Sequence, residues 1–132
     1  MPGVSDSELK KVIADFLAMG HVDNIVAMFR REPAYLAFTG EILADERFAV
    51  RLGVCVLFEE LKESALQPPQ LERAIPSLVR LLSSESATIR GEAIGLLGLI
   101  GTARAIEHIR AMQGDPSSQV REMVALALEE LQ

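Results

Sequence analysis

The chain has 132 residues, 49% of them hydrophobic, and a formal net charge of −6. This length and composition predict one folded domain rather than a disordered segment, and no apolar run reaches the roughly 18 residues that a membrane span needs. The negative charge and the lack of Trp argue against a nucleic-acid partner, which would need basic and base-stacking surfaces. The single cysteine and the absence of a signal-peptide pattern favour a cytoplasmic protein.

Nearly every segment shows the 3.6-residue apolar period of a helix, and none alternates like a strand. The predicted helices follow in chain order at about residues 9–17, 22–29, 34–43, 48–65, 71–82, 87–100, 103–113 and 117–131. Short polar turns separate them, and the clearest linker is the Gln-Pro-Pro-Gln stretch at residues 67–70. The last helix should begin with Asp115 as its cap and Pro116 in its first turn. Eight helices joined in this way predict four antiparallel hairpins in an all-α fold.

Three stretches of the chain align with one another, beginning at Val50, Ile89 and Val120. Each continues with an arginine and then carries an apolar side chain four, eight and eleven residues after its first residue. In the middle stretch the first of these three side chains is the small Ala93. The stretches start 39 and 31 residues apart, and a polar turn precedes each one. A unit that recurs at this interval predicts an α-solenoid, in which stacked hairpins bury one continuous core.

This pattern resembles the HEAT repeat, in particular the short bacterial kind found in phycobilisome-lyase-like proteins. The resemblance implies a HEAT/armadillo-like superhelix that forms a single domain over residues 1–132. Its repeats are expected at residues 34–66, 70–101 and 102–132. The resemblance is weak over residues 1–33, which are expected to be a degenerate repeat or a cap. Pro76 is similar to the proline that often bends the first helix of such a repeat.

Each aligned stretch carries an arginine at its second position: Arg51, Arg90 and Arg121. A turn aspartate six residues earlier is a further mark of the family that this pattern resembles, and Asp45 and Asp115 fit it, whereas the middle repeat has Ser84. The arginines could line a groove and hold a carboxylate or phosphate. They could instead bond to the turn aspartates and nearby carbonyls and so tie one repeat to the next. Identical placement in every repeat favours this structural ladder.

The second helix of each hairpin should line the concave face of the solenoid. The residues expected there, opposite the buried stripes, are Leu52, Cys55, Val56, Glu59, Gly91, Ile94, Gly95, Glu122, Leu126 and Glu129. Glycine in a helix interior costs about 1 kcal/mol relative to alanine, so Gly91, Gly95 and Gly98 suggest that something approaches this face closely. That could be a partner in an open groove or a neighbouring helix of the same chain. The tendency of apolar surface to mark contacts favours the groove.

No catalytic, metal-binding or cofactor-binding residues are expected. Cys55 lies in mid-helix without a cationic neighbour in sequence, so an inert thiol is favoured over a reactive one. His21 and His108 lie in different hairpins and do not supply the three or four ligands of a zinc site. The adjacent glutamates at residues 59–60 and 129–130 are typical of a solvated helix face.

The leading hypothesis is therefore a non-catalytic scaffold that binds a protein segment, basic and amphipathic, on its concave face. The resemblance also leaves open a lyase-like enzyme or enzyme subunit of the bilin-lyase kind. A third alternative is a self-associating module or homodimer. The contact expected for it is the groove or the C-terminal edge. The outer face of the last hairpin is favoured, because Met123 takes the position held there by Glu92 one repeat earlier.

Overall fold

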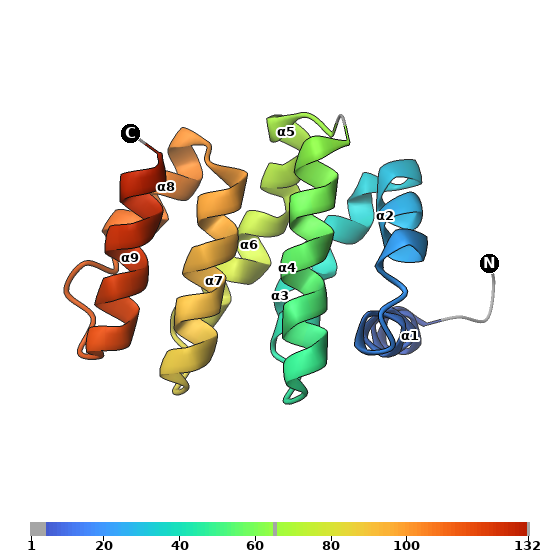
Figure 1. The fold of residues 1–132 in the computed structure, drawn as a ribbon, viewed down its shortest axis with the longest axis horizontal. Coiled ribbons are helices and arrows are strands. Elements are labelled where there is room, and N and C mark those ends of the chain that lie inside the picture. The colour runs from blue at the N-terminus through green and yellow to red at the C-terminus, as the bar shows by residue number, and fades with distance from the viewer. Residues whose placement is uncertain (1–4, 65, 132) are drawn as a thin grey trace.

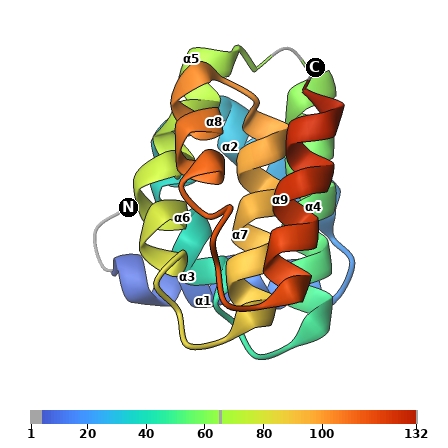
Figure 2. The same cartoon turned by 90° about the vertical axis from the view of Figure 1, so that its left-hand side faces the viewer.

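A computed structural model of the chain describes residues 5–64 and 66–131, and its helices stack in two layers (Figure 1). The front layer of Figure 1 contains α2 (Val22–Arg31), α4 (Phe48–Glu63), α7 (Ala87–Ile100) and α9 (Ser118–Glu130). The back layer contains α3 (Thr39–Leu43), α6 (Ile75–Leu81) and α8 (Ala103–Arg110). Figure 2 shows the two layers side by side from the end of the row that α9 occupies. The described residues contain no strand, so the predicted all-α solenoid is confirmed.

Helix α1 (Asp6–Ala18) departs from this arrangement. It lies across the N-terminal end of the row, nearly perpendicular to α4 (Figures 1 and 2). The two helices approach closely at Gly53, where an added Cβ would lie 2.8 Å from the Cβ of Leu17. Arg47, at the start of α4, also pairs with Asp15 of α1 at 3.0 Å. These contacts hold α1 against the first of the aligned helices.

Two back-layer helices are broken where the sequence predicts one continuous helix. Residues 34–43 form a 3₁₀ segment, η1 (Pro33–Phe38), followed by α3. Residues 71–82 are divided among α5 (Pro68–Leu71), η2 (Glu72–Ala74) and α6. The second break has a clear cause, because Pro76 lacks an N–H and its ring crowds the carbonyl four residues earlier. Pro76 therefore stands in the first turn of α6, where a proline is tolerated.

The α3 and α6 helices approach closely through Gly40 and Ser77. The backbone N–H of Gly40 donates to the hydroxyl of Ser77 (2.9 Å), and that hydroxyl donates to the carbonyl of Ala74 (3.1 Å). A Cβ on Gly40 would lie 2.3 Å from the carbonyl oxygen of Ser77. Only glycine fits at this point, because a backbone atom cannot move aside without moving its helix.

The start of α9 differs from the sequence prediction. Ser117, not Asp115, is its N-cap, and the Ser117 hydroxyl accepts a hydrogen bond from the N–H of Val120. The Asp115 carboxylate instead accepts from the N–H of Ser117 (2.8 Å) and from Arg90 of the preceding hairpin. A carboxylate with a cation in reach gains more from that pair than from a neutral cap.

The aligned apolar positions form the core. In the aligned helices α4, α7 and α9, the buried positions are Val50, Val54, Phe58, Leu61, Ala93, Leu97, Ile100, Val120 and Val124, and Ile89 is half-buried. The last two positions of the third stretch, Leu128 and Leu131, are only half-buried. No described helix packs on the far side of α9, which accounts for their partial exposure.

We expect Gly40→Ala to lower the free energy of unfolding by at least about 3 kcal/mol, at the upper end of overpacking effects, because the clash is with backbone. Urea denaturation followed by circular dichroism measures this. Gly114→Ala is the matched control, since an added Cβ there meets nothing within 4 Å. Equal stability of the two variants would contradict the close approach of α3 and α6.

Candidate functional site

The three aligned arginines share one hydrogen bond. In each case Nη1 donates to the backbone carbonyl of the residue six positions earlier. The acceptors are Asp45 for Arg51 (3.1 Å), Ser84 for Arg90 (2.8 Å) and Asp115 for Arg121 (2.7 Å). Each guanidinium is thus fixed against the turn of its own hairpin.

Two of these arginines also bind a carboxylate of the following hairpin. Arg90 donates from Nε and Nη2 to the two carboxylate oxygens of Asp115, at 2.9 and 3.0 Å. Arg51 donates from Nε to Oε1 of Glu92 at 3.2 Å. Oε2 of Glu92 lies 3.0 Å from the same nitrogen without accepting a hydrogen bond from any described residue. These ion pairs join neighbouring hairpins.

The acceptors differ from the sequence prediction in one respect. The turn aspartate offers the arginine of its own repeat its backbone carbonyl rather than its carboxylate. The carboxylate of Asp45 is bound by Arg47, two residues away. The carboxylate of Asp115 is bound by Arg90, one repeat earlier. The side chain therefore connects two repeats, while the backbone connects the turn with its own helix.

The repeat that lacks the turn aspartate obtains its carboxylate elsewhere. Ser84 stands at the aspartate position, and its hydroxyl accepts a hydrogen bond from the N–H of Ser86 within its own turn. Glu92 on α7 binds Arg51 instead. In the next repeat Asp115 supplies the charge and the Glu92 position holds the apolar Met123. Each junction between the aligned hairpins thus contains one arginine and one carboxylate from the following hairpin.

Both turn aspartates are stabilised in their ionised form. Hydrogen bonds from the Arg90 guanidinium and then from the Ser117 N–H hold the pKa of Asp115 below its usual range. Hydrogen bonds from Arg47 lower the pKa of Asp45 in the same way. A carboxylate whose pKa is lowered by folding stabilises the folded state wherever it is ionised.

The surroundings of Cys55 favour the protonated thiol. Burial raises the pKa of Cys55, and the carboxylates of Glu92 and Glu59 raise it further. A nucleophilic cysteine needs the opposite environment. Among the residues that the structure describes, no three His, Cys, Asp or Glu side chains are grouped so that they could hold a metal ion.

The glycines of α7 face α9, which closes most of the groove expected over them. A Cβ on Gly91 would lie 3.5 Å from Cγ of Met123, and one on Gly95 would lie 3.3 Å from its Cε. A Cβ on Gly98 would lie 3.3 Å from the Cβ of Ala127. The glycines thus serve the second of the two alternatives, the close approach of a neighbouring helix of the same chain.

Three predicted positions therefore need correction. Ile94 is completely buried and Gly91 is buried, so neither forms exposed partner surface. Met123 is half-buried, in agreement with its predicted partial exposure, but it packs back onto α7, so its predicted place on the outer face of the last hairpin is wrong. The reason is the same for all three residues, because α7 and α9 pack on each other directly at this face.

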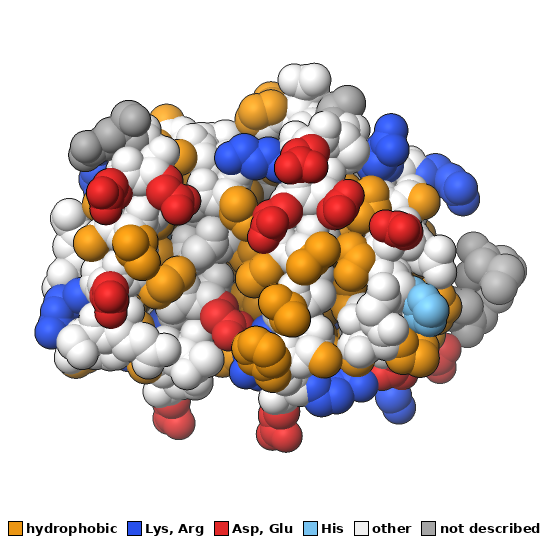
Figure 3. All heavy atoms as spheres, in the orientation of Figure 1, with side chains coloured by type: hydrophobic (Ala, Val, Ile, Leu, Met, Phe, Trp, Pro, Cys, Tyr) orange, Lys and Arg blue, Asp and Glu red, His pale blue; other side chains and the backbone are white. Residues whose placement is uncertain are grey.

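The other predicted positions remain accessible, in two separate places. Leu52 (52% exposed) with the half-buried Val56 lies on α4, and Leu126 (48% exposed) lies on α9. Figure 3 shows hydrophobic side chains gathered over α4 and again over α9. The remaining predicted positions are the half-buried Cys55 and Gly95 and the exposed Glu59, Glu122 and Glu129.

The apolar surface on α4 borders a groove of about 220 Å³ between this helix and the α1–α2 turn. We call it the α4 groove, and its lining residues are Leu17, Ala18, Gly20, Val22, Ala49, Leu52, Gly53 and Val56. The sequence predicts Leu52 and Val56 at this surface but not the wall formed by the α1–α2 turn. The available signal for that wall was Gly53, which takes the position of Glu92 and Met123 in the other aligned stretches, together with Gly20.

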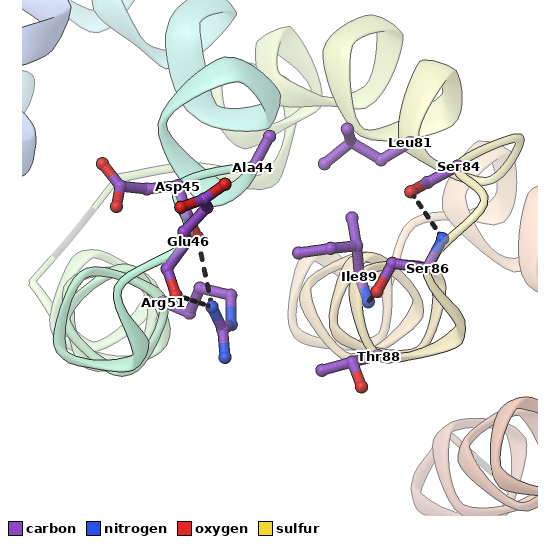
Figure 4. A pocket seen from close by; sticks show the side chains of 9 residues that line it. All are labelled: Ala44, Asp45, Glu46, Arg51, Leu81, Ser84, Ser86, Thr88 and Ile89. Atoms are coloured by element: carbon purple, nitrogen blue, oxygen red, sulfur yellow. Dashed lines mark hydrogen bonds between the residues drawn. The ribbon is translucent and has the colours of Figure 1, made fainter.

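A larger hollow of about 500 Å³ separates the turn before α4 from the turn before α7 (Figure 4). One side is lined by Ala44, Asp45, Glu46 and Arg51. The other side is lined by Leu81, Ser84, Ser86, Thr88 and Ile89. It opens where the short Ser84 replaces an aspartate. Arg51 is already paired with Glu92 and two carbonyls, so this hollow has little attraction for an anion.

Comparison with known proteins agrees with this repeat structure. A family whose description is HEAT repeats matches the chain over residues 36–129. Comparison with curated proteins finds no match. Among the described helices, none has the length and apolar character needed to cross a membrane.

The exchange of carboxylate positions between repeats can be tested by moving the carboxylate that binds Arg51 from position 92 to position 84. We expect Glu92→Met to lower the free energy of unfolding by about 1–3 kcal/mol, because Arg51 loses its charged acceptor. Adding Ser84→Asp should restore more than half of that loss, since the junction then has the composition seen around Arg90 and Asp115. Chemical denaturation of the two single variants and the double variant gives the coupling. Additive effects would refute the exchange.

The lowered pKa of Asp115 predicts an acid-dependent contribution to stability. Its folded pKa lies below the ordinary value of 3.8, so the contribution is complete above that value and is lost as the pH falls towards the lowered folded pKa. Asp115→Asn should therefore lower the melting temperature at neutral pH, and the difference from the wild type should shrink as the solution is acidified below about pH 4. Glu60→Gln, a change at an exposed position, is the control. A difference that is independent of pH would contradict the ion pair.

Proposed function

The chain belongs to the HEAT-repeat family, and from this premise we propose that it is a non-catalytic scaffold that binds a segment of another protein in the α4 groove. Solenoids of this kind present extended surfaces to their partners. Here α7 and α9 close one part of such a surface against each other. The α4 groove is the part that stays open.

The observation that carries the proposal is the exposed leucine at the edge of an apolar hollow. Leu52 is 52% exposed, and the groove beside it is lined almost wholly by apolar or small residues. Two further exposed apolar side chains are Phe48 (64% exposed), four residues before Leu52 on α4, and Met19 (61% exposed), between Ala18 and Gly20 of the groove lining. Contiguous apolar surface around a hollow is typical of a contact site, in which one or two side chains of the partner are buried.

The charge around the groove indicates what kind of segment would bind. Glu59, Glu60 and Glu63 are exposed on the C-terminal half of α4, and Figure 3 shows acidic side chains gathered beyond the apolar part of this helix. A segment with apolar anchors on one face and basic residues beside them complements both features. An amphipathic, basic helix has this pattern. The acidic residues would mainly speed association and set orientation, while burial supplies affinity.

The chain offers a matched pair of variants for testing this. Leu52 and Leu126 have nearly equal exposure, 52% and 48%, but only Leu52 lines the α4 groove. We expect Leu52→Asp to weaken binding at least tenfold, or by about 1.4 kcal/mol, because it strands a charge in an apolar contact. Leu126→Asp should leave binding within about twofold of wild type, and both variants should fold normally.

The experiment captures partners from an extract of the source cell with each variant as bait. The bound segment is then mapped, synthesised and titrated by calorimetry against all three proteins. A partner that binds Leu52→Asp as tightly as wild type would place the site elsewhere. A covalent pigment adduct on the wild-type protein would overturn the non-catalytic assignment.

A further inference from the structure

We propose that the outer face of α9 is a self-complementary surface that docks a second copy of the chain. The two α9 helices would lie antiparallel about a twofold axis near Ala125. Arg121 of each copy would pair with Glu129 of the other. This surface shares no residue with the α4 groove, so the proposal stands independently of the proposed function.

The preceding repeat shows that this stripe of the helix is a contact face. With an offset of 31 residues, the positions that correspond to Arg121, Ala125 and Glu129 are Arg90, Ile94 and Gly98. All three are engaged or enclosed at the junction with the last hairpin. Arg90 binds Asp115, Ile94 is completely buried, and a Cβ on Gly98 would touch Ala127. On α9 the same stripe is exposed at each of its three positions.

Arg121 is held ready for a carboxylate. Its Nη1 donates to the carbonyl of Asp115 at 2.7 Å, the same bond that fixes Arg51 and Arg90. Those two arginines each direct Nε to a carboxylate of the following hairpin. Within residues 5–64 and 66–131, no carboxylate lies within ion-pair distance of Arg121. The guanidinium thus presents its remaining donors towards whatever packs on α9.

The stripe is symmetric in a way that suits a second copy. Residues 121, 125 and 129 are four positions apart and lie along one side of the helix. When two such helices pack antiparallel and cross at residue 125, each residue 121 lies opposite residue 129 of the other. Two arginine–glutamate pairs then form at once, as an isologous contact requires. The small side chain of Ala125 allows the helix backbones to approach at the axis.

Other occupants fit the surface less well. A purely acidic partner would be attracted by Arg121 but repelled by Glu122 and Glu129, which are both exposed on the same helix. Stacking of the C-terminal end of one copy on the N-terminal end of another is also disfavoured. There α1 lies across the row instead of continuing it (Figure 1). The charge pattern therefore favours α9 against α9.

Sedimentation velocity of the full chain, at protein concentrations from about 1 to 500 µM, tests this proposal, because a small contact gives micromolar affinity. The wild type should dimerise within this range. Arg121→Glu alone and Glu129→Arg alone should each be monomeric, because each places like charges opposite one another. An equimolar mixture of the two variants should recover the dimer, since every cross-copy pair is then attractive.

The charge reversal at Arg121 also removes its bond to Asp115, so a second disruption is needed that leaves this bond intact. Ala125→Glu places two carboxylates at the axis and should abolish the dimer. Ala27→Glu, at an exposed alanine of α2 at the other end of the row, should leave the dimer unchanged. Circular dichroism of each variant checks that it is folded.

Three outcomes overturn the proposal. The first is a wild type that stays monomeric up to the highest concentration. The second is a dimer that survives Ala125→Glu. The third is a mixture of the two charge-reversal variants that fails to associate, which would mean that Arg121 and Glu129 do not pair between copies.

Discussion

The stacking of the aligned hairpins depends on one arginine in each. Its Nη1 is bonded to the turn of its own hairpin, and in the first two aligned repeats its Nε is bonded to a carboxylate of the following one. A planar guanidinium can make both contacts at once because its donors point in fixed directions. A hairpin alone cannot bury its apolar stripe. The arginine therefore orients the surface on which the following hairpin buries its apolar stripe.

The position of the carboxylate at each junction decides whether the neighbouring helix position is free for an apolar side chain. Where Asp115 supplies it from the turn, the helix position is free for Met123, which packs over the glycines of α7 and closes that surface. Where Glu92 supplies it from the helix, that position carries a charge instead of an apolar side chain. The closed face over α7 therefore follows from this exchange of residues. The α4 groove has a separate origin, because it lies between α4 and the α1–α2 turn.

Helical periodicity was enough to predict the fold class and several helix bounds, including residues 87–100 of α7. It was not enough for the site, because a helical wheel gives the angle of a side chain but not which neighbouring hairpin lies in that direction. Ile94 was therefore predicted as exposed, and Met123 was assigned to the wrong side of α9. The break before Pro76 and the cap at Ser117 depend on competition between nearby groups. Such competition is decided by three-dimensional contacts that periodicity does not contain.

The two proposed surfaces lie at opposite ends of the row of helices, with α4 towards α1 and α9 at the other end (Figure 1). Association through α9 would therefore leave the α4 groove open in both copies. A dimer of this kind would present two equivalent grooves, related by the same twofold axis. A partner with two binding segments could then occupy both, and the second contact would form at an effective concentration set by the linker between the segments. A small scaffold with a shallow groove could in this way bind tightly without any larger apolar surface.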